Sequence, residues 1–80
     1  MDEPAELDQE RRLARLSVTE LWLRYFELGG MTSPIEFEAV LHGALVPSTH
    51  DRDVIAVALN ERFQELGVDR RVRYGRNDEA

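Results

Sequence analysis

Two histidines and the acidic side chains near them come closest in spacing to a metal site. Glu38 and His42 are four residues apart, so a helix would place both on one side, and His50 precedes Asp51 and Asp53. A transition-metal site needs three or four ligands that converge, and this spacing supplies only a pair. An exposed Glu–His pair and a polar helix start account for the same residues, so we expect no metal and no cofactor.

Six hydroxyl side chains are available as nucleophiles. All except one stand at or beside predicted helix starts, where a hydroxyl caps free backbone N–H groups. The chain has no cysteine, no Gly-x-Ser-x-Gly turn and no phosphate-binding glycine loop, and its 80 residues leave little room for a deep pocket. We therefore expect no catalytic residues and no enzyme. The six residues are Ser17, Thr19, Thr32, Ser33, Ser48 and Thr49, of which Thr19 is the exception.

A basic segment near the carboxyl end is the one local feature suited to binding an anion. Arginines around a tyrosine can contact phosphates and stack a base, which makes RNA the alternative partner. The competing interpretation, which we favour, is that these arginines pair with acidic groups while the apolar side chains among them pack. Residues 1–10 hold five acidic residues and no basic one. The segment contains Arg70, Arg71, Arg73 and Tyr74.

The charge balance disfavours DNA binding. The net charge is −6, whereas nucleic-acid-binding domains show a clear basic surface. In a helix-turn-helix the recognition helix would begin at Thr49, and Asp51 and Asp53 would be repelled by the phosphates. No apolar stretch is long enough to span a membrane, and the acidic first residues do not form a secretory signal. We expect a cytoplasmic protein that binds neither DNA nor membrane.

The elements that must position these residues are helices with recognisable ends. Ser17 and Ser33 each precede a glutamate by three residues, which is the capping-box pattern, and each opens an apolar run with helical periodicity. We predict an all-α fold, a small bundle with three core helices over about 18–28, 34–45 and 49–66.

Two further segments flank this core. Residues 5–16 are rich in helix formers and predict an additional amino-terminal helix, which either continues into the next helix or breaks at Ser17. Residues 68–74 alternate apolar and polar positions and predict a short extended segment on the bundle. We predict a single domain over 1–80, with an ordered core over about 13–74 and flexible ends.

Part of this pattern is similar to a known family. The spacing between residues 30 and 56 resembles that of the ANTAR family, small three-helix domains that bind RNA in bacterial antitermination. The resemblance implies a three-helix fold and an RNA-linked regulatory role. It rests on core and cap positions, and the first helix is less basic than in that family, so no functional residue is carried over. The matching positions are Gly30, Ser33, Phe37, Leu41, Ala44, Asp53, Val54 and Ala56.

An apolar surplus on the helix over 18–28 is the feature that points most directly to a function. Leu23 lies roughly opposite the inner face, and Leu16 aligns with it if the helix extends backwards. Together with Trp22 and Phe26 these residues predict a contiguous apolar patch, unless the amino-terminal helix folds back to cover it.

From these observations we predict a non-catalytic protein–protein interaction module, either a small adaptor or regulator or a homo-oligomer. The predicted partner-binding residues are Leu16, Trp22, Leu23 and Phe26. The alternative is an RNA-linked regulatory module of the ANTAR-like three-helix type that uses the basic carboxyl-terminal segment.

Overall fold

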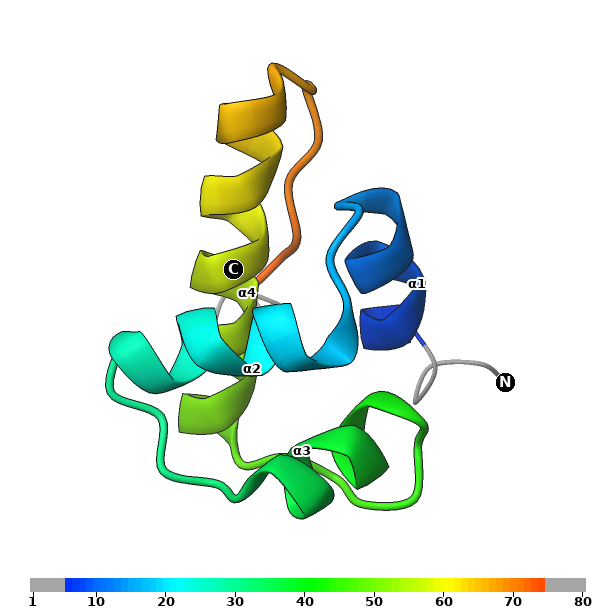
Figure 1. Ribbon diagram of the computed structural model, residues 1–80, viewed down its shortest axis with the longest axis vertical. Coiled ribbons are helices and arrows are strands. Elements are labelled where there is room, and N and C mark those ends of the chain that lie inside the picture. Colours follow the sequence, from blue (N-terminus) through cyan, green and yellow to red (C-terminus); the bar gives the residue numbers. More distant parts are fainter. Residues whose placement is uncertain (1–5, 75–80) are drawn as a thin grey trace.

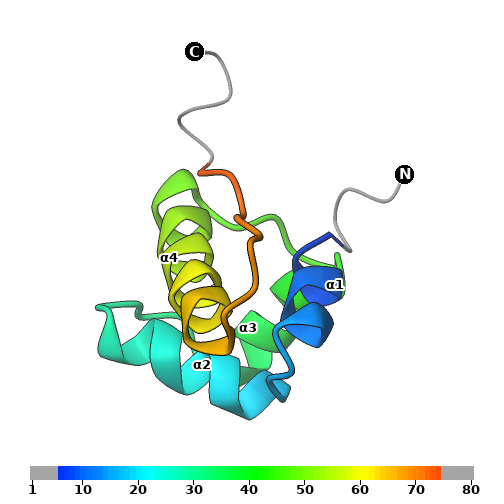
Figure 2. The same cartoon turned by 90° about the horizontal axis from the view of Figure 1, so that it is seen from above.

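Four helices make up the computed structural model, which describes residues 6–74. They are α1 (Glu6–Leu13), α2 (Val18–Glu27), α3 (Pro34–Leu41) and α4 (Thr49–Leu66). The described residues contain no strand, so the all-α prediction is confirmed. The long α4 is crossed by α2, α3 packs against the same side of α2 as α4 does, and α1 packs against α3 (Figures 1 and 2). No described helix is long and apolar enough to cross a membrane.

Serine caps start three of the helices, as the sequence predicts. Ser17 forms the complete capping box, because Glu20 returns a bond from its Oε1 to the Ser17 backbone N–H at 2.8 Å. Ser33 caps α3, with Pro34 in the first turn, but the predicted capping box is incomplete there, because only the bond from the Glu36 backbone N–H to Ser33 Oγ is present between these two residues. The Oγ atoms of Ser17, Ser33 and Ser48 accept from the backbone N–H groups of Glu20, Glu36 and Asp51 at 3.0, 3.2 and 3.0 Å.

A sharp turn separates α1 from α2 and corrects the predicted place of Leu16. Arg15 has a φ of 60°, a conformation that non-glycine residues rarely adopt, so α1 stops and the chain changes direction. Leu16 consequently enters the core with 7 % of its surface exposed, instead of joining Leu23 on the outside. Arginine side chains hold the turn, since Arg11 donates to Leu16 O at 2.9 Å and Arg62 to Ala14 O at 3.0 Å.

The second of the three predicted core helices is shorter than expected. The predicted helix 34–45 ends at Leu41, because Gly43 takes a φ of 87° and the chain curls back so that Ala44 N–H donates to Ala39 O at 2.8 Å. The helices predicted over 18–28 and 49–66 match α2 and α4 closely.

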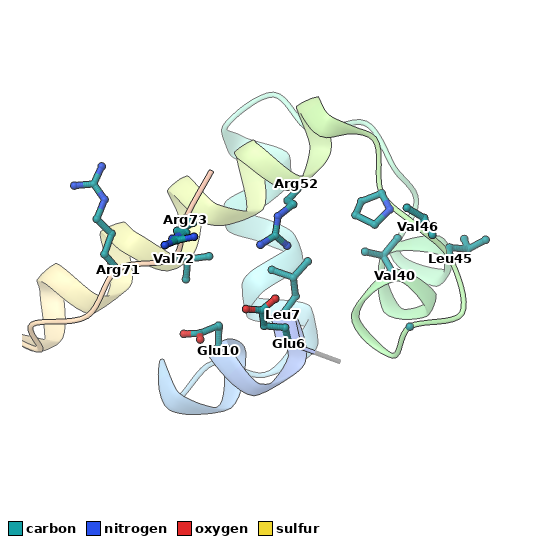
Figure 3. A pocket seen from close by; sticks show the side chains of 12 residues that line it. Glu6, Leu7, Glu10, Val40, Leu45, Val46, Arg52, Arg71, Val72 and Arg73 are labelled. Carbon is teal, nitrogen blue, oxygen red and sulfur yellow. The ribbon is translucent and has the colours of Figure 1, made fainter. Parts of the chain in front are cut away.

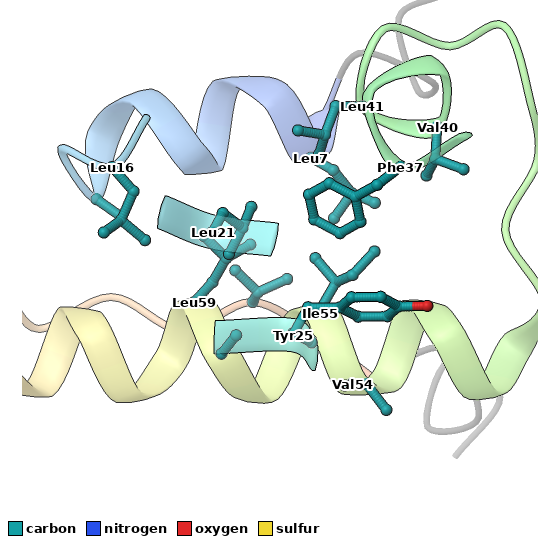
Figure 4. Packing of buried hydrophobic residues seen from close by; sticks show 14 of the residues in the cluster. Leu7, Leu16, Leu21, Tyr25, Phe37, Val40, Leu41, Val54, Ile55 and Leu59 are labelled. Atoms are coloured by element: carbon teal, nitrogen blue, oxygen red, sulfur yellow. The ribbon is translucent and has the colours of Figure 1, made fainter. Parts of the chain in front are cut away.

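The core gathers side chains from all four helices (Figure 4). Leu7 of α1 is buried in it, so the amino-terminal helix docks on the bundle. The ordered core was predicted to begin at about residue 13, and this is wrong for residues 6–12, which form most of α1; the remaining parts of the predicted flexible ends, 1–5 and 75–80, lie outside the described residues. Seven large side chains are almost completely buried: Leu21, Tyr25, Phe37, Leu41, Ile55, Leu59 and Phe63.

The carboxyl-terminal segment is extended and runs beside α4, in agreement with the prediction for residues 68–74 (Figures 1 and 2). The Asn60 side chain binds it as a neighbouring strand would. Its Oδ1 accepts from Val72 N–H at 2.6 Å and its Nδ2 donates to Val72 O at 3.1 Å. These two hydrogen bonds to one residue fix the path of the segment, in which Val72 is buried.

Ion pairs tie α2 to α4 at the surface. The Arg24 guanidinium donates to both carboxylate oxygens of Glu65, at 2.7 and 3.0 Å. This hydrogen bond lowers the pKa of Glu65 and raises that of Arg24. The backbone N–H of Ser17 likewise lowers the pKa of Glu20. Both carboxyls therefore bind protons less readily in the folded chain than in the unfolded one.

Gly30 is required for close packing rather than for a left-handed turn. Gly29 has a φ of 104° and ends α2, but a Cβ atom added to Gly30 would overlap the ring of Tyr25. We expect Gly30→Ala to lower the free energy of unfolding by about 3 kcal/mol, because the well-packed core would have to shift. Gly67→Ala is the control, with a φ of 72° but open space, and its expected cost is about 1 kcal/mol. Urea unfolding measures both, and equal losses would contradict this packing role.

Acid should destabilise the protein partly through Glu65. The pKa of Glu65 is lowered in the folded state. Its contribution to the free energy of unfolding is therefore present above the unfolded-state pKa and is lost as the pH falls through the folded-state pKa. We expect Glu65→Gln to flatten the fall in unfolding free energy between about pH 6 and about pH 3. Parallel pH curves for the variant and the original chain would show that the pair with Arg24 contributes nothing.

Candidate interaction surfaces

The residues with metal-binding or catalytic potential occupy structural positions. His42 is the last-turn cap of α3, and His50 is exposed in the first turn of α4. Within residues 6–74, no three His, Cys, Asp or Glu side chains converge as a metal site requires. The serine hydroxyls accept capping bonds, and the Thr32 hydroxyl donates to Asp51 at 3.3 Å. These contacts give the three capping serines and Thr32 structural roles.

The outer side of α2 carries an exposed apolar surface, here called the α2 face, formed by Trp22, Leu23 and Phe26. Leu23 and Phe26 are 47 % and 55 % exposed. Trp22 and Phe26 stack with ring centroids 5.1 Å apart and planes 19° apart. The structure therefore groups three of the four predicted partner-binding residues and excludes Leu16. Because Leu23 and Phe26 remain half exposed, α1 does not cover them, and the alternative that the amino-terminal helix folds over this face is wrong.

The α2 face is held in place by a buried tyrosine. The hydroxyl of Tyr25 accepts from the backbone N–H groups of Met31 and Thr32, at 3.2 and 2.9 Å, and donates to Asp51 Oδ1 at 3.0 Å. It thus joins α2, the following loop and the first turn of α4. The carbonyl of Thr32 in turn accepts from Trp22 Nε1 at 2.9 Å. One hydroxyl therefore places the loop that orients the partly buried Trp22.

The basic carboxyl-terminal segment is largely occupied by contacts within the chain. Arg70 donates to both carboxylate oxygens of Glu10 at 2.7 Å, and these hydrogen bonds raise the pKa of Arg70. The Arg71 guanidinium carbon lies 5.7 Å from the centroid of the Tyr74 ring. The predicted pairing of this segment with acidic groups is therefore present at Arg70, while Arg73 forms no ion pair with a described residue.

A groove opens where the two ends of the described chain meet. It lies among α1, the loop between α3 and α4, the first turn of α4 and the carboxyl-terminal segment, and its volume is about 690 Å³ (Figure 3). We call it the Arg52 groove, since Arg52 of α4 points across it toward α1. Its other charged lining residues are Glu6, Glu10, Arg71 and Arg73, and its apolar lining residues include Leu7, Val40, Leu45, Val46, Pro47 and Val72.

Comparison with known proteins assigns no family. No family model matches the chain, and no curated protein and no solved structure shows significant similarity to it. The role implied by the resemblance to the ANTAR family therefore stays a prediction from the sequence.

The sequence analysis missed the Arg52 groove, because its walls come from four separate segments. The available signal was Val46, an apolar residue beside Pro47 in a connection between helices, where no helical periodicity explains it. The role of Tyr25 was likewise not predicted. A tyrosine at a buried position is itself a signal, since its hydroxyl needs a partner.

We expect Tyr25→Phe to lower the free energy of unfolding by about 2 kcal/mol, because two backbone N–H groups and one carboxylate lose a buried partner. The environment of Trp22 should change with it, which its fluorescence emission would report. Tyr74→Phe is the control, since the Tyr74 ring packs on the core edge and none of the hydrogen bonds found among residues 6–74 uses its hydroxyl. If Tyr25→Phe unfolds at the same urea concentration as the original chain, the hydroxyl does not organise the loop.

Proposed function

We propose that this chain is a non-catalytic protein–protein interaction module, a small adaptor or regulator or a homo-oligomer, that binds through the α2 face. The observation that carries the proposal is the exposure of Leu23 and Phe26 beside a tryptophan that is fixed in position. Large apolar side chains that a small chain leaves grouped on its surface are typical of partner-binding sites.

The α2 face is ordered before any partner arrives. Trp22 is bonded to Thr32 O and stacked on Phe26, so it loses little side-chain freedom on binding. Tryptophan is among the residues that most often dominate interface energies. Charged side chains border the patch, with Glu20 and Glu27 on the same helix, and a polar rim around an apolar centre is the usual anatomy of an interface.

The RNA-linked alternative has less support. Two of its four predicted residues, Arg70 and Arg71, already contact Glu10 and Tyr74. Phosphate binding would have to displace those contacts. RNA binding is therefore kept as one outcome of the experiment below.

The decisive variant is Leu23→Arg. Arginine at this position lies three residues after Glu20 and four before Glu27, so the helix should tolerate it. We expect Leu23→Arg to abolish the concentration-dependent rise in mass measured by light scattering, if the partner is a second copy. If the partner is another protein, we expect the variant to lose a polypeptide that the tagged original chain captures from lysate in fixed proportion.

Leu13→Arg is the matched control. Leu13 is exposed to a similar degree, 52 %, but lies at the end of α1, where a positive charge suits the helix dipole. It should leave both measurements unchanged. The proposal fails if Leu23→Arg behaves as Leu13→Arg does, or if the captured material is RNA that added salt releases.

A further inference from the structure

The arginines between residues 6 and 74 differ in whether they pair with a carboxylate. Five of these nine lie within ion-pair distance of one: Arg11, Arg12, Arg24, Arg62 and Arg70. Arg52 and Arg73 line the groove and form no ion pair with any residue between 6 and 74. Arg52 is moreover partly buried, where an uncompensated guanidinium is costly. A groove in which two arginines form no ion pair with a described residue, in a chain with a net charge of −6, offers a place for anionic groups.

The same groove displays apolar side chains that the fold does not cover. Val46 is 93 % exposed, and Leu45 beside it is half exposed. Both line the groove together with the more buried Val40 and Leu7. Figure 3 shows Val40, Leu45 and Val46 together on one wall, with Arg52 between them and Arg73 and with Leu7 below Arg52 on α1. Carboxylates and an apolar side chain on one ligand would therefore meet complementary surfaces within a short distance.

The chain's own acids leave these arginines available. Glu10 lines the groove but is bound at both carboxylate oxygens by Arg70. Glu6 also lines it and lies outside ion-pair distance of Arg52. Its negative charge would oppose an incoming carboxylate, since it is not neutralised by a described partner.

We propose that the Arg52 groove binds an acidic peptide segment of a partner protein, with an apolar side chain against Val46 and carboxylates on Arg52 and Arg73. Guanidinium groups bind carboxylates in a forked geometry, which gives both affinity and orientation. A peptide is favoured over a small molecule because the groove is only about half enclosed, whereas small-molecule sites enclose most of their ligand. The proposal rests on residues outside the α2 face.

The experiment is an NMR titration of backbone amides in the full chain, using a short peptide of alternating leucine and glutamate. We expect shifts at the amides of Val46 and Val72. Arg52→Gln and Arg73→Gln should each weaken binding about fivefold, as expected for the loss of one charge-assisted hydrogen bond. Glu6→Gln should act in the opposite direction and tighten it. Arg15→Gln is the matched control, because Arg15 is exposed in the α1–α2 turn and should leave binding unchanged.

Several results would overturn the proposal. It fails if a leucine–glutamine peptide binds as well, if Arg52→Gln acts no differently from Arg15→Gln, or if the shifts fall on α2. It also fails if a short single-stranded RNA binds the groove more tightly than the acidic peptide, because the groove would then be a phosphate site. Leu23→Arg should leave the titration unchanged, so failure here and failure of the α2 face are separate results.

Discussion

The hydroxyl of Tyr25 is the contact on which the arrangement of α2, α3 and α4 depends. A buried hydroxyl without partners is costly, and this one has three, from two different parts of the chain. Meeting them draws the loop after α2 and the first turn of α4 toward the same point. Gly30 follows from this, because the loop passes so close to the ring that any side chain there would overlap it.

The hydrogen bonds of Tyr25 on the inner side of α2 also influence how Trp22 is positioned on the outer side. The loop held by Tyr25 supplies the carbonyl that binds Trp22, so core packing and the exposed stack of Trp22 on Phe26 are linked. A second link joins the two ends of the described chain, since the bidentate pair of Arg70 with Glu10 brings the walls of the Arg52 groove together. The molecule thus has two separate surfaces, one apolar on α2 and one apolar and basic at the meeting of its ends.

Local signals in the sequence were sufficient to predict where α2, α3 and α4 begin. Ser17, Ser33 and Ser48 begin helices because a hydroxyl next to free N–H groups needs only neighbouring residues. Leu16 was misplaced because Arg15 adopts a left-handed conformation, which no residue pattern announces for an arginine. All three residues of the α2 face were predictable from helical periodicity alone. The Arg52 groove was not, since it depends on contacts between residues far apart in the chain.

Amide hydrogen exchange at Met31 and Thr32 tests most directly whether one buried hydroxyl organises this molecule. Both residues lie outside the helices, where exchange is ordinarily fast, yet their N–H groups are bonded to Tyr25 Oη. The account predicts protection at these two amides close to that of the α2 core, because exchange requires Tyr25 to leave its site. Exchange as rapid as that of an open loop would contradict it, and would remove the fixed loop on which the presentation of Trp22 depends.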